Sequence, residues 1–307
     1  MSREGLFRRL AVVTALFAYL QIALGGVVRV SGSGLGCPDW PLCNGRPYPP
    51  ANIHSIIEYS HRAVGSVTGI LIIATVVMAW IVFRKRRPLV AWLASASLIG
   101  VVGEGILGGI VVARELSPWL VVVHLGLAML IIGFLVATAI AAMPASSGVP
   151  DLNFRRRAIV VTAATYVMML TGSTVVASGA DETCNSWPLC GGGFALDFTG
   201  ANAFTMLHRG TVLVVGILLL HVLSKALLRW SSVKGMRPIA IAAIVALVVQ
   251  VGVGAGSAIT GSAVFNGLHV ALATLVWSGV LMTTLLTVPR ADKNPELSRL
   301  EVDRTSA

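Results

Sequence analysis

The chain has 307 residues, of which 56% are hydrophobic and only 12% are charged. A water-soluble domain carries about twice that charged fraction, so the composition excludes an ordinary soluble protein and predicts an integral membrane protein surrounded by lipid. The net charge of +10 would suggest a nucleic-acid partner in a soluble protein. Here the basic residues fall in short loops, where they set membrane orientation, so no nucleic-acid partner is expected.

A membrane-spanning helix needs roughly 20 apolar residues. Eight segments meet this requirement and predict an all-α membrane protein: 8–28, 61–83, 89–112, 118–141, 156–177, 206–228, 238–259 and 263–288. Two connections, 29–60 and 178–205, are long. Apolar segments recur along the whole chain, so no cleaved signal peptide is expected. The absence of a Ser/Arg-rich transit segment favours a prokaryotic plasma membrane.

The basic residues predict the orientation of these helices. Of the 23 Lys and Arg residues, 18 fall at one set of helix ends, within 3–9, 84–87, 155–157, 225–237 and 290–304. The other five, at the opposite ends, are Arg29, Arg46, Arg62, Arg114 and Arg209. The positive-inside rule therefore predicts a multi-pass protein with both termini in the cytoplasm and both long loops outside.

The two long loops belong to an internal repeat. Leu24–Arg62 aligns without gaps with Thr171–Arg209 at an offset of 147 residues. The matched residues include Gly25 with Gly172, the WPLC motif at 40–43 with that at 187–190, and His61-Arg62 with His208-Arg209. Because each copy contains an even number of helices, the repeat is parallel. It predicts two pseudo-symmetric four-helix bundles, formed by residues 1–145 and 146–307.

Four of the six histidines follow the repeat: His61 matches His208, and His124 matches His269. We expect His61 and His208 to open their helices, and the other two to lie one or two turns in. All four would then sit at one depth near the outer surface. His54, expected in the outer loop, and His221, about 20 Å deeper at 1.5 Å per residue, are interpreted as non-ligands.

Polar residues inside a membrane are costly and commonly mark function. Two neutral imidazoles from facing helices suit the two axial positions of heme iron. Zinc would take three or four ligands, usually with Cys or carboxylate, and only Glu58 is expected at the same depth. The pattern therefore predicts one heme in each half. Another metal, or hydrogen-bonded histidines without a metal, are the alternatives.

The four cysteines form two equivalent pairs, Cys37/Cys43 and Cys184/Cys190, both in loops expected to face an oxidising compartment. A short disulfide that staples each loop is the structural interpretation. The functional alternative is a thiol pair that exchanges electrons.

The two copies of the repeat differ at Glu58, which corresponds to Thr205 in the second half. Glu58 precedes His61 by three residues, so both lie on one helix face, where a carboxylate could act in acid–base chemistry. A solvated interfacial residue or a salt bridge to Arg62 is the alternative. Arg62 and Arg209 are either partners for heme propionates or interfacial anchors. Glu104 is expected to be an unpaired acid within the membrane, either protonated or hydrogen-bonded, with a proton path as one hypothesis.

These residues resemble the heme A synthase family, the heme O oxygenases of cytochrome oxidase biogenesis. The resemblance covers roughly residues 8–288. It rests on GGVVRVSGSGLGCPDWPLC at 25–43, EYSHR at 58–62, LGGIVV at 107–112, His124, LHRG at 207–210 and GLHVA at 267–271. Many members of the family carry one cysteine pair or none, so a part for either pair in turnover stays open.

The resemblance implies an oxidoreductase that converts the C8 methyl group of heme O to a formyl group by successive hydroxylations. It implies a heme b cofactor on His208 and His269 in the second half. The substrate heme O would bind at His61 and His124 in the first half, with Glu58 as the essential acid. It also implies association with heme O synthase; a small homo-oligomer is compatible with the sequence, and the electron donor is open.

Two other functions remain alternatives. A bis-histidine diheme electron-transfer cytochrome would treat its two hemes alike and would not need Glu58 in one half only. A heme carrier would need alternating access, and the sequence predicts no broken helices at the midplane.

Overall fold

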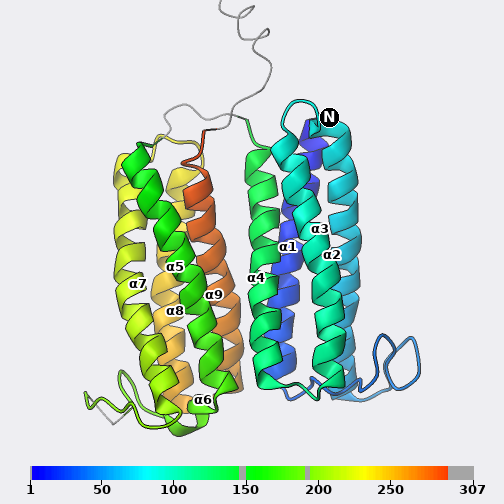
Figure 1. Ribbon diagram of the computed structural model, residues 1–307, viewed down its shortest axis with the longest axis vertical. Helices are drawn as coiled ribbons and strands as arrows, with labels where there is room; N and C mark the ends of the chain where they lie inside the picture. Colours follow the sequence, from blue (N-terminus) through cyan, green and yellow to red (C-terminus); the bar gives the residue numbers. More distant parts are fainter. Residues whose placement is uncertain (1, 145–149, 191–193, 290–307) are drawn as a thin grey trace, which may run out of the picture.

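The computed structural model describes residues 2–144, 150–190 and 194–289. The described residues form eight long helices, a short one, and no strand (Figure 1). The helices are α1 (Arg3–Val30), α2 (Ile53–Phe83), α3 (Pro88–Ala113), α4 (Pro118–Ala141), α5 (Leu152–Ala177), α6 (Ala180–Thr183), α7 (Asn202–Arg229), α8 (Met236–Thr260) and α9 (Ala263–Leu285).

All helices except α6 are long and apolar enough to cross a membrane, which confirms the eight predicted spans and the all-α class. Large side chains such as Ile70, Ile99 and Leu213 are exposed on the outside of the bundle. An apolar surface of this kind is stable against lipid rather than water. The chain is therefore a multi-pass membrane protein.

Four predicted helix starts, those of α1, α2, α5 and α7, are four or more residues too late, because polar residues extend the helices beyond their apolar cores. Helix α2 begins at Ile53 rather than 61, where the side chain of Asn52 caps it by accepting from the N–H groups of His54 and Ser55. Helix α7 begins at Asn202 rather than 206. His61 and His208 therefore lie inside their helices instead of opening them, and His54 belongs to α2 rather than to the loop. The short helix α6 was not expected.

The helices form two groups that lie side by side, α1–α4 in one and α5, α7, α8 and α9 in the other (Figure 1). Within each group the helices pack in a closed ring: α1 contacts α2 and α4, and α3 contacts α2 and α4. In the second group α5 contacts α7 and α9, and α8 contacts α7 and α9. The pseudo-symmetry of the two bundles, inferred from the repeat, stays a prediction.

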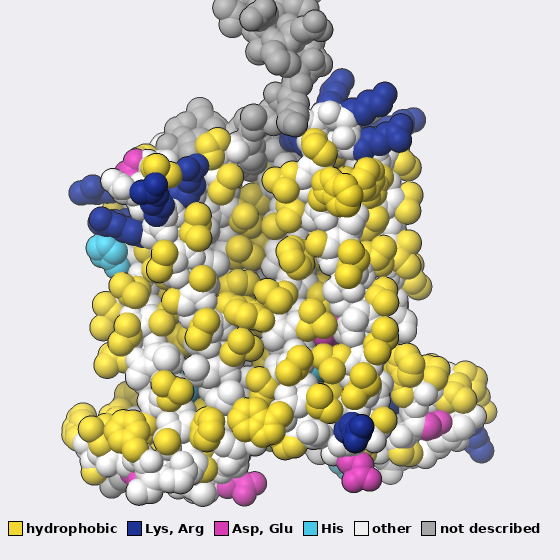
Figure 2. Space-filling view, viewed as in Figure 1, with side chains coloured by type: hydrophobic (Ala, Val, Ile, Leu, Met, Phe, Trp, Pro, Cys, Tyr) yellow, Lys and Arg dark blue, Asp and Glu magenta, His cyan; other side chains and the backbone are white. Residues whose placement is uncertain are grey.

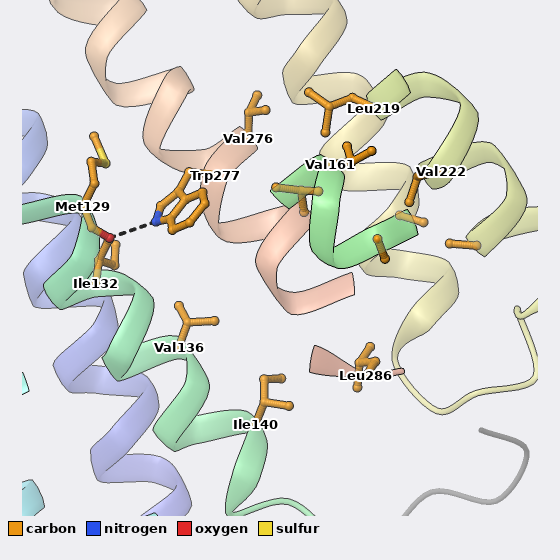
Figure 3. Packing of buried hydrophobic residues seen from close by; sticks show 14 of the residues in the cluster. Met129, Ile132, Val136, Ile140, Val161, Leu219, Val222, Val276, Trp277 and Leu286 are labelled. Carbon is orange, nitrogen blue, oxygen red and sulfur yellow. Dashed lines mark hydrogen bonds between the residues drawn. The ribbon is translucent and has the colours of Figure 1, made fainter. Parts of the chain in front are cut away.

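The two groups meet where α9 packs against α1 and α4, and α4 packs against α5. Trp277 of α9 points toward α4, and its Nε1 donates to the carbonyl oxygen of Met129 at 2.9 Å (Figure 3). A large cluster of buried apolar side chains from both groups surrounds this bond. Gly26 of α1 lies so close to α9 that an added Cβ would sit 3.3 Å from Cβ of Val270.

The two ends of the molecule differ in charge. Figure 2 shows most of the visible Lys and Arg side chains at one end, which we call the basic end. The opposite end carries the two long loops, residues 31–52 and 178–201, and we call it the loop end (Figure 1). Both loops contain a disulfide, Cys37–Cys43 and Cys184–Cys190.

Candidate functional site

Each of the four matched histidines lies against a glycine of the neighbouring helix. His61 of α2 packs on Gly25 of α1, and His124 of α4 packs on Gly108 of α3. In the second group, His208 of α7 packs on Gly172 of α5, and His269 of α9 packs on Gly254 of α8. Each glycine lies five or six residues before the loop end of its helix. The four imidazoles therefore share one depth near the loop end.

The two contacts of the second half are too close for a Cβ to be added without a shift of the ring. A Cβ added at Gly172 would lie 2.8 Å from Cε1 of His208, and one added at Gly254 would lie 2.9 Å from Cε1 of His269. The corresponding distance is 3.1 Å at Gly25 and 3.4 Å at Gly108. Glycine thus lets each ring lie directly on the backbone of the adjacent helix.

The two histidines of each group lie on opposite helices of its ring, His61 on α2 and His124 on α4, and His208 on α7 and His269 on α9. Their ring nitrogens have different neighbours. Nε2 of His61 accepts a hydrogen bond from Nε2 of Gln21 (3.3 Å), whereas Nδ1 of His208 bonds to Oγ1 of Thr171 (3.1 Å). The bond at Nδ1 leaves Nε2 of His208 for another partner.

Buried polar atoms without a hydrogen-bond partner concentrate at these positions. Seven side-chain atoms of the described residues have none, and all belong to histidines of the two pairs or to side chains near them. They are Gln21 Oε1, His61 Nδ1, Glu104 Oε2, His124 Nδ1, Thr205 Oγ1, Gln250 Oε1 and His269 Nδ1. Because such atoms are costly, their concentration makes these two places the candidate binding sites.

The residues at each place suit heme better than a bare metal ion. Among the described residues, no group of three or more His, Cys, Asp or Glu side chains could hold a metal ion. Two imidazoles from facing helices are instead the donor set of the two axial positions of heme iron. Each group of helices therefore has the ligands for one bis-histidine heme.

Glu58 is buried, with 4% of its surface exposed, and both carboxylate oxygens are engaged. Oε2 accepts from the backbone N–H of Cys37 at 2.7 Å, and Oε1 accepts from Nη2 of Arg62 at 2.5 Å. The salt bridge expected as one alternative is therefore present. Glu58 ties the first disulfide loop to α2 one turn before His61.

Arg62 completes this connection. Besides Glu58, its guanidinium donates to three backbone carbonyl oxygens of the loop: Cys37 and Asp39 at 2.7 Å and Leu42 at 2.6 Å. The same side chain thus makes three hydrogen bonds to the loop and a fourth to Glu58 of α2. This geometry supports the anchor interpretation of Arg62 over a propionate partner.

The equivalent positions of the second half are looser. Thr205, in place of Glu58, is buried and its hydroxyl has no partner among the described residues. Arg209 donates to the carbonyl oxygen of Pro188 at 3.0 Å, its one hydrogen bond in the described part of the chain. The remaining N–H groups of Arg209 are the ones that suit an acidic group of a ligand.

A carboxylate organises each loop. In the first loop, the backbone N–H groups of Gly45 and Asn44 donate hydrogen bonds to the carboxylate of Asp39. These bonds hold the pKa of Asp39 below its ordinary value, and the bond from Gly45 has the larger effect. Hydrogen bonds from Thr199 do the same for the pKa of Asp197 in the second loop. Both loops therefore keep an ionised carboxylate at neutral pH.

Glu104 of α3 faces the first pair of histidines. Its Oε1 lies 3.2 Å from Nδ1 of His124. This contact lacks hydrogen-bond geometry, so Nδ1 of His124 stays without a hydrogen-bond partner, but Glu58 is not the only acid near the histidines. The apolar stretch around Glu104 contains no signal for this contact, because the partner lies on the next helix.

The two remaining histidines lie apart from these pairs. Nδ1 of His54 bonds to Oγ of Ser33 at 3.0 Å, near the start of α2. His221 is exposed on α7, 13 residues beyond His208. That neither is a ligand stays a prediction.

Sequence reasoning missed several residues that surround the histidines. Gly25 and Gly172 appeared as matched residues, but without a role. Gly108 and Gly254, and likewise Glu104 and Gln250, correspond at an offset of 146 residues, a match that the sequence contains and that reveals the second pair of glycine contacts. Gln21 and Thr171 carried no signal, because they do not correspond in the repeat.

Known proteins are similar to this chain over most of its length. The model of the COX15-CtaA family, described as cytochrome oxidase assembly protein, matches residues 8–56 and 52–281. A protein of Shouchella clausii named heme A synthase is 28% identical over 292 residues, and the match covers 92% of this chain and 94% of the length of that protein. A heme A synthase of Alkalihalophilus pseudofirmus is 28% identical, covering 91% of this chain and 97% of its own. A heme A synthase of Geobacillus kaustophilus is 32% identical over 183 residues, covering 56% of this chain and 57% of its own.

Proposed function

The chain belongs to the COX15-CtaA family of cytochrome oxidase assembly proteins, and we propose that it is a heme A synthase, an oxidoreductase that converts heme O to heme A. The relatives that carry this name cover nearly the whole chain. In this reaction the C8 methyl group of heme O becomes a formyl group through successive hydroxylations. The substrate is apolar and membrane-bound, as is the protein.

We propose that the two halves, residues 1–145 and 146–307, hold different hemes. His208 and His269 of the second half would hold heme b, and His61 and His124 of the first half would hold the substrate heme O. The observation that carries this assignment is that both halves contain the paired imidazoles, whereas only the first adds the buried carboxylate Glu58. Its counterpart Thr205 cannot accept or release a proton at neutral pH.

Heme b, when bound, supplies one-electron transfer, and the protein residues determine where it occurs. Glu58 and Arg62 hold the loop of residues 31–52 against α2, beside His61. Trp40 of the same loop lies on Gly109 of α3, where an added Cβ would be 3.2 Å from the indole. The loop thereby covers the first histidine pair from the loop end and limits the access of water.

Glu58 is proposed as the catalytic carboxylate of the first half, next to His61 and His124. The guanidinium of Arg62 stays paired with that carboxylate. The same ion pair would therefore serve the acid–base chemistry and hold the loop of residues 31–52 on α2. Arg209, which has N–H groups to spare, is proposed to pair with a heme propionate in the second half.

We further propose that the protein lies in the plasma membrane with both termini in the cytoplasm and the loop end outside. Two features support this orientation. Lys and Arg gather at the basic end (Figure 2), as cytoplasmic ends do. The disulfides lie at the opposite end, where an oxidising compartment preserves them. A heme O synthase would supply the substrate, through a direct complex because heme O dissolves poorly in water.

A bis-histidine electron-transfer cytochrome is the second candidate, because the glycine contacts of the histidines are alike in both halves. The discriminating experiment is to express the protein together with a heme O synthase and extract its hemes for mass analysis. Heme A or its C8-hydroxymethyl precursor beside heme b is the expected result. Heme b alone, with heme O present in the same membranes, would favour the cytochrome.

A further inference from the structure

Glu104 lies in the membrane-spanning part of α3, where a carboxylate is costly unless it serves a purpose. Its Oε1 is 3.2 Å from Nδ1 of His124, and its Oε2 is buried without a hydrogen-bond partner among the described residues. Neither the proposed reaction nor the packing of α3 accounts for this acid.

One face of α3 provides both contacts to His124. Gly108 carries the imidazole ring, with 3.4 Å between an added Cβ and Cε1, and Glu104 precedes Gly108 by four residues. Residues four apart lie on the same helix face. The carboxylate is thus placed beside Nδ1 of a ring that also contacts Gly108 of the same helix face.

The second half has the same arrangement with a different side chain. Gln250 precedes Gly254 by four residues, as Glu104 precedes Gly108. Its Nε2 donates to the backbone carbonyl oxygen of His269 at 3.0 Å. In the second half, the neutral amide of Gln250 therefore bonds to the backbone of the histidine, whereas in the first half the carboxylate of Glu104 lies beside the imidazole ring.

A carboxylate beside one imidazole nitrogen favours the tautomer in which that nitrogen carries the proton. The other nitrogen then keeps its lone pair for iron and becomes a stronger donor, as for histidines that bind metals in other proteins. An amide that bonds to the backbone exerts no such effect on the ring.

We propose that Glu104 is a positioning residue for His124, which holds the proton on Nδ1, directs Nε2 toward the iron of heme O and makes His124 a stronger donor than His269. This inference rests on the proposed function, because it assigns the substrate heme to the first half. A stronger donor stabilises ferric iron, so the first-half heme would have the lower midpoint potential of the two.

The test uses purified protein that contains heme b, with ferric heme O added under argon. Affinity is measured by optical titration, and midpoint potentials by redox titration of the loaded protein. E104Q, which keeps the size of the side chain, should weaken the binding of ferric heme O by about 10- to 100-fold. It should also raise the potential of that heme and leave heme b unchanged.

Q250A is the matched control, and we expect it to leave the heme O affinity and potential at wild-type values. E104D keeps the carboxylate but moves it one methylene further from His124. We expect its bound heme O to have a midpoint potential between the wild-type value and that of E104Q, and a shift from the wild-type value can be measured even if E104Q does not fold. Wild-type affinity and potential in E104Q, or a wild-type potential in E104D, would overturn the proposal.

His124→Ala separates this proposal from the proposed function. If H124A no longer binds heme O while E104Q binds it as wild type does, only the role of Glu104 fails. If H124A still binds heme O with wild-type affinity, the first-half site and the role of Glu104 fail together.

Discussion

The two halves of the protein share their histidines and differ in what surrounds them. In the first half, Glu58 and Arg62 bind the disulfide loop tightly to α2, and Glu104 approaches His124. In the second half, Thr205 replaces Glu58 and Gln250 replaces Glu104. The duplicated residues are those proposed to bind heme, and the carboxylates found in the first half alone are those proposed to take part in its chemistry.

This difference indicates which residues serve both halves of the repeat and which serve one half only. Glycine contacts and imidazoles are present in both halves, as the proposal of one heme with two ligands in each half requires. Buried carboxylates are costly within a membrane, so they persist only where they act. The comparison predicts that equivalent substitutions in the two halves have unequal effects.

The largest effect is expected for Glu58→Ala. Loss of a general acid–base group reduces a rate by about 10²- to 10⁴-fold, so heme A formation should fall to background while heme b stays bound. The measurement is mass analysis of extracted hemes after co-expression with heme O synthase. Thr205→Ala is the matched control and should retain activity. Full activity of Glu58→Ala would remove Glu58 from the mechanism.

Arg62→Gln should have the next largest effect. Breaking a buried ion pair costs about 3–5 kcal/mol, so the loop of residues 31–52 should detach from α2 and become accessible to protease. Limited proteolysis and the initial rate of heme A formation measure this change. Arg209→Gln should leave the first loop protected and lower heme b affinity instead. Equal protease sensitivity of both variants would contradict the asymmetry of the loops.

The glycine contacts predict a graded response. Gly172→Ala places a Cβ 2.8 Å from the ring of His208, whereas Gly108→Ala places one 3.4 Å from the ring of His124. Overpacking of this kind costs about 1–3 kcal/mol, so we expect Gly172→Ala to lower heme b occupancy. Gly108→Ala should leave it unchanged, as measured by the ratio of heme to protein. Normal heme b in Gly172→Ala would show that the ring position is not decisive.

The smallest effect is expected for the disulfides. Replacing both cysteines of a pair by serine removes a cross-link worth about 2 kcal/mol to its loop. Cys37→Ser with Cys43→Ser should reduce activity several-fold, because the N–H of Cys37 bonds to Glu58. Cys184→Ser with Cys190→Ser should lower only the melting temperature in detergent. Complete inactivation by the second pair would indicate a redox role.

Much of the fold was predictable from the sequence, because spans of apolar residues and the alternation of basic loops both follow from the membrane. The early start of α2 was not, since a polar segment capped by Asn52 has no hydropathy signal. The repeat identified the histidines, the cysteines and the asymmetry at Glu58. It could not reveal the contact between Glu104 and His124, or that Arg62 bonds to three loop carbonyls, because these depend on the packing of separate helices.

The central claim is that the two histidine pairs hold different hemes. The most direct test is mass analysis of the hemes in two double variants, each produced together with heme O synthase. The protein with His61→Ala and His124→Ala should keep heme b and contain neither heme O nor heme A, whereas that with His208→Ala and His269→Ala should lose heme b. Loss of heme b from the first variant, or its full retention in the second, would contradict the assignment.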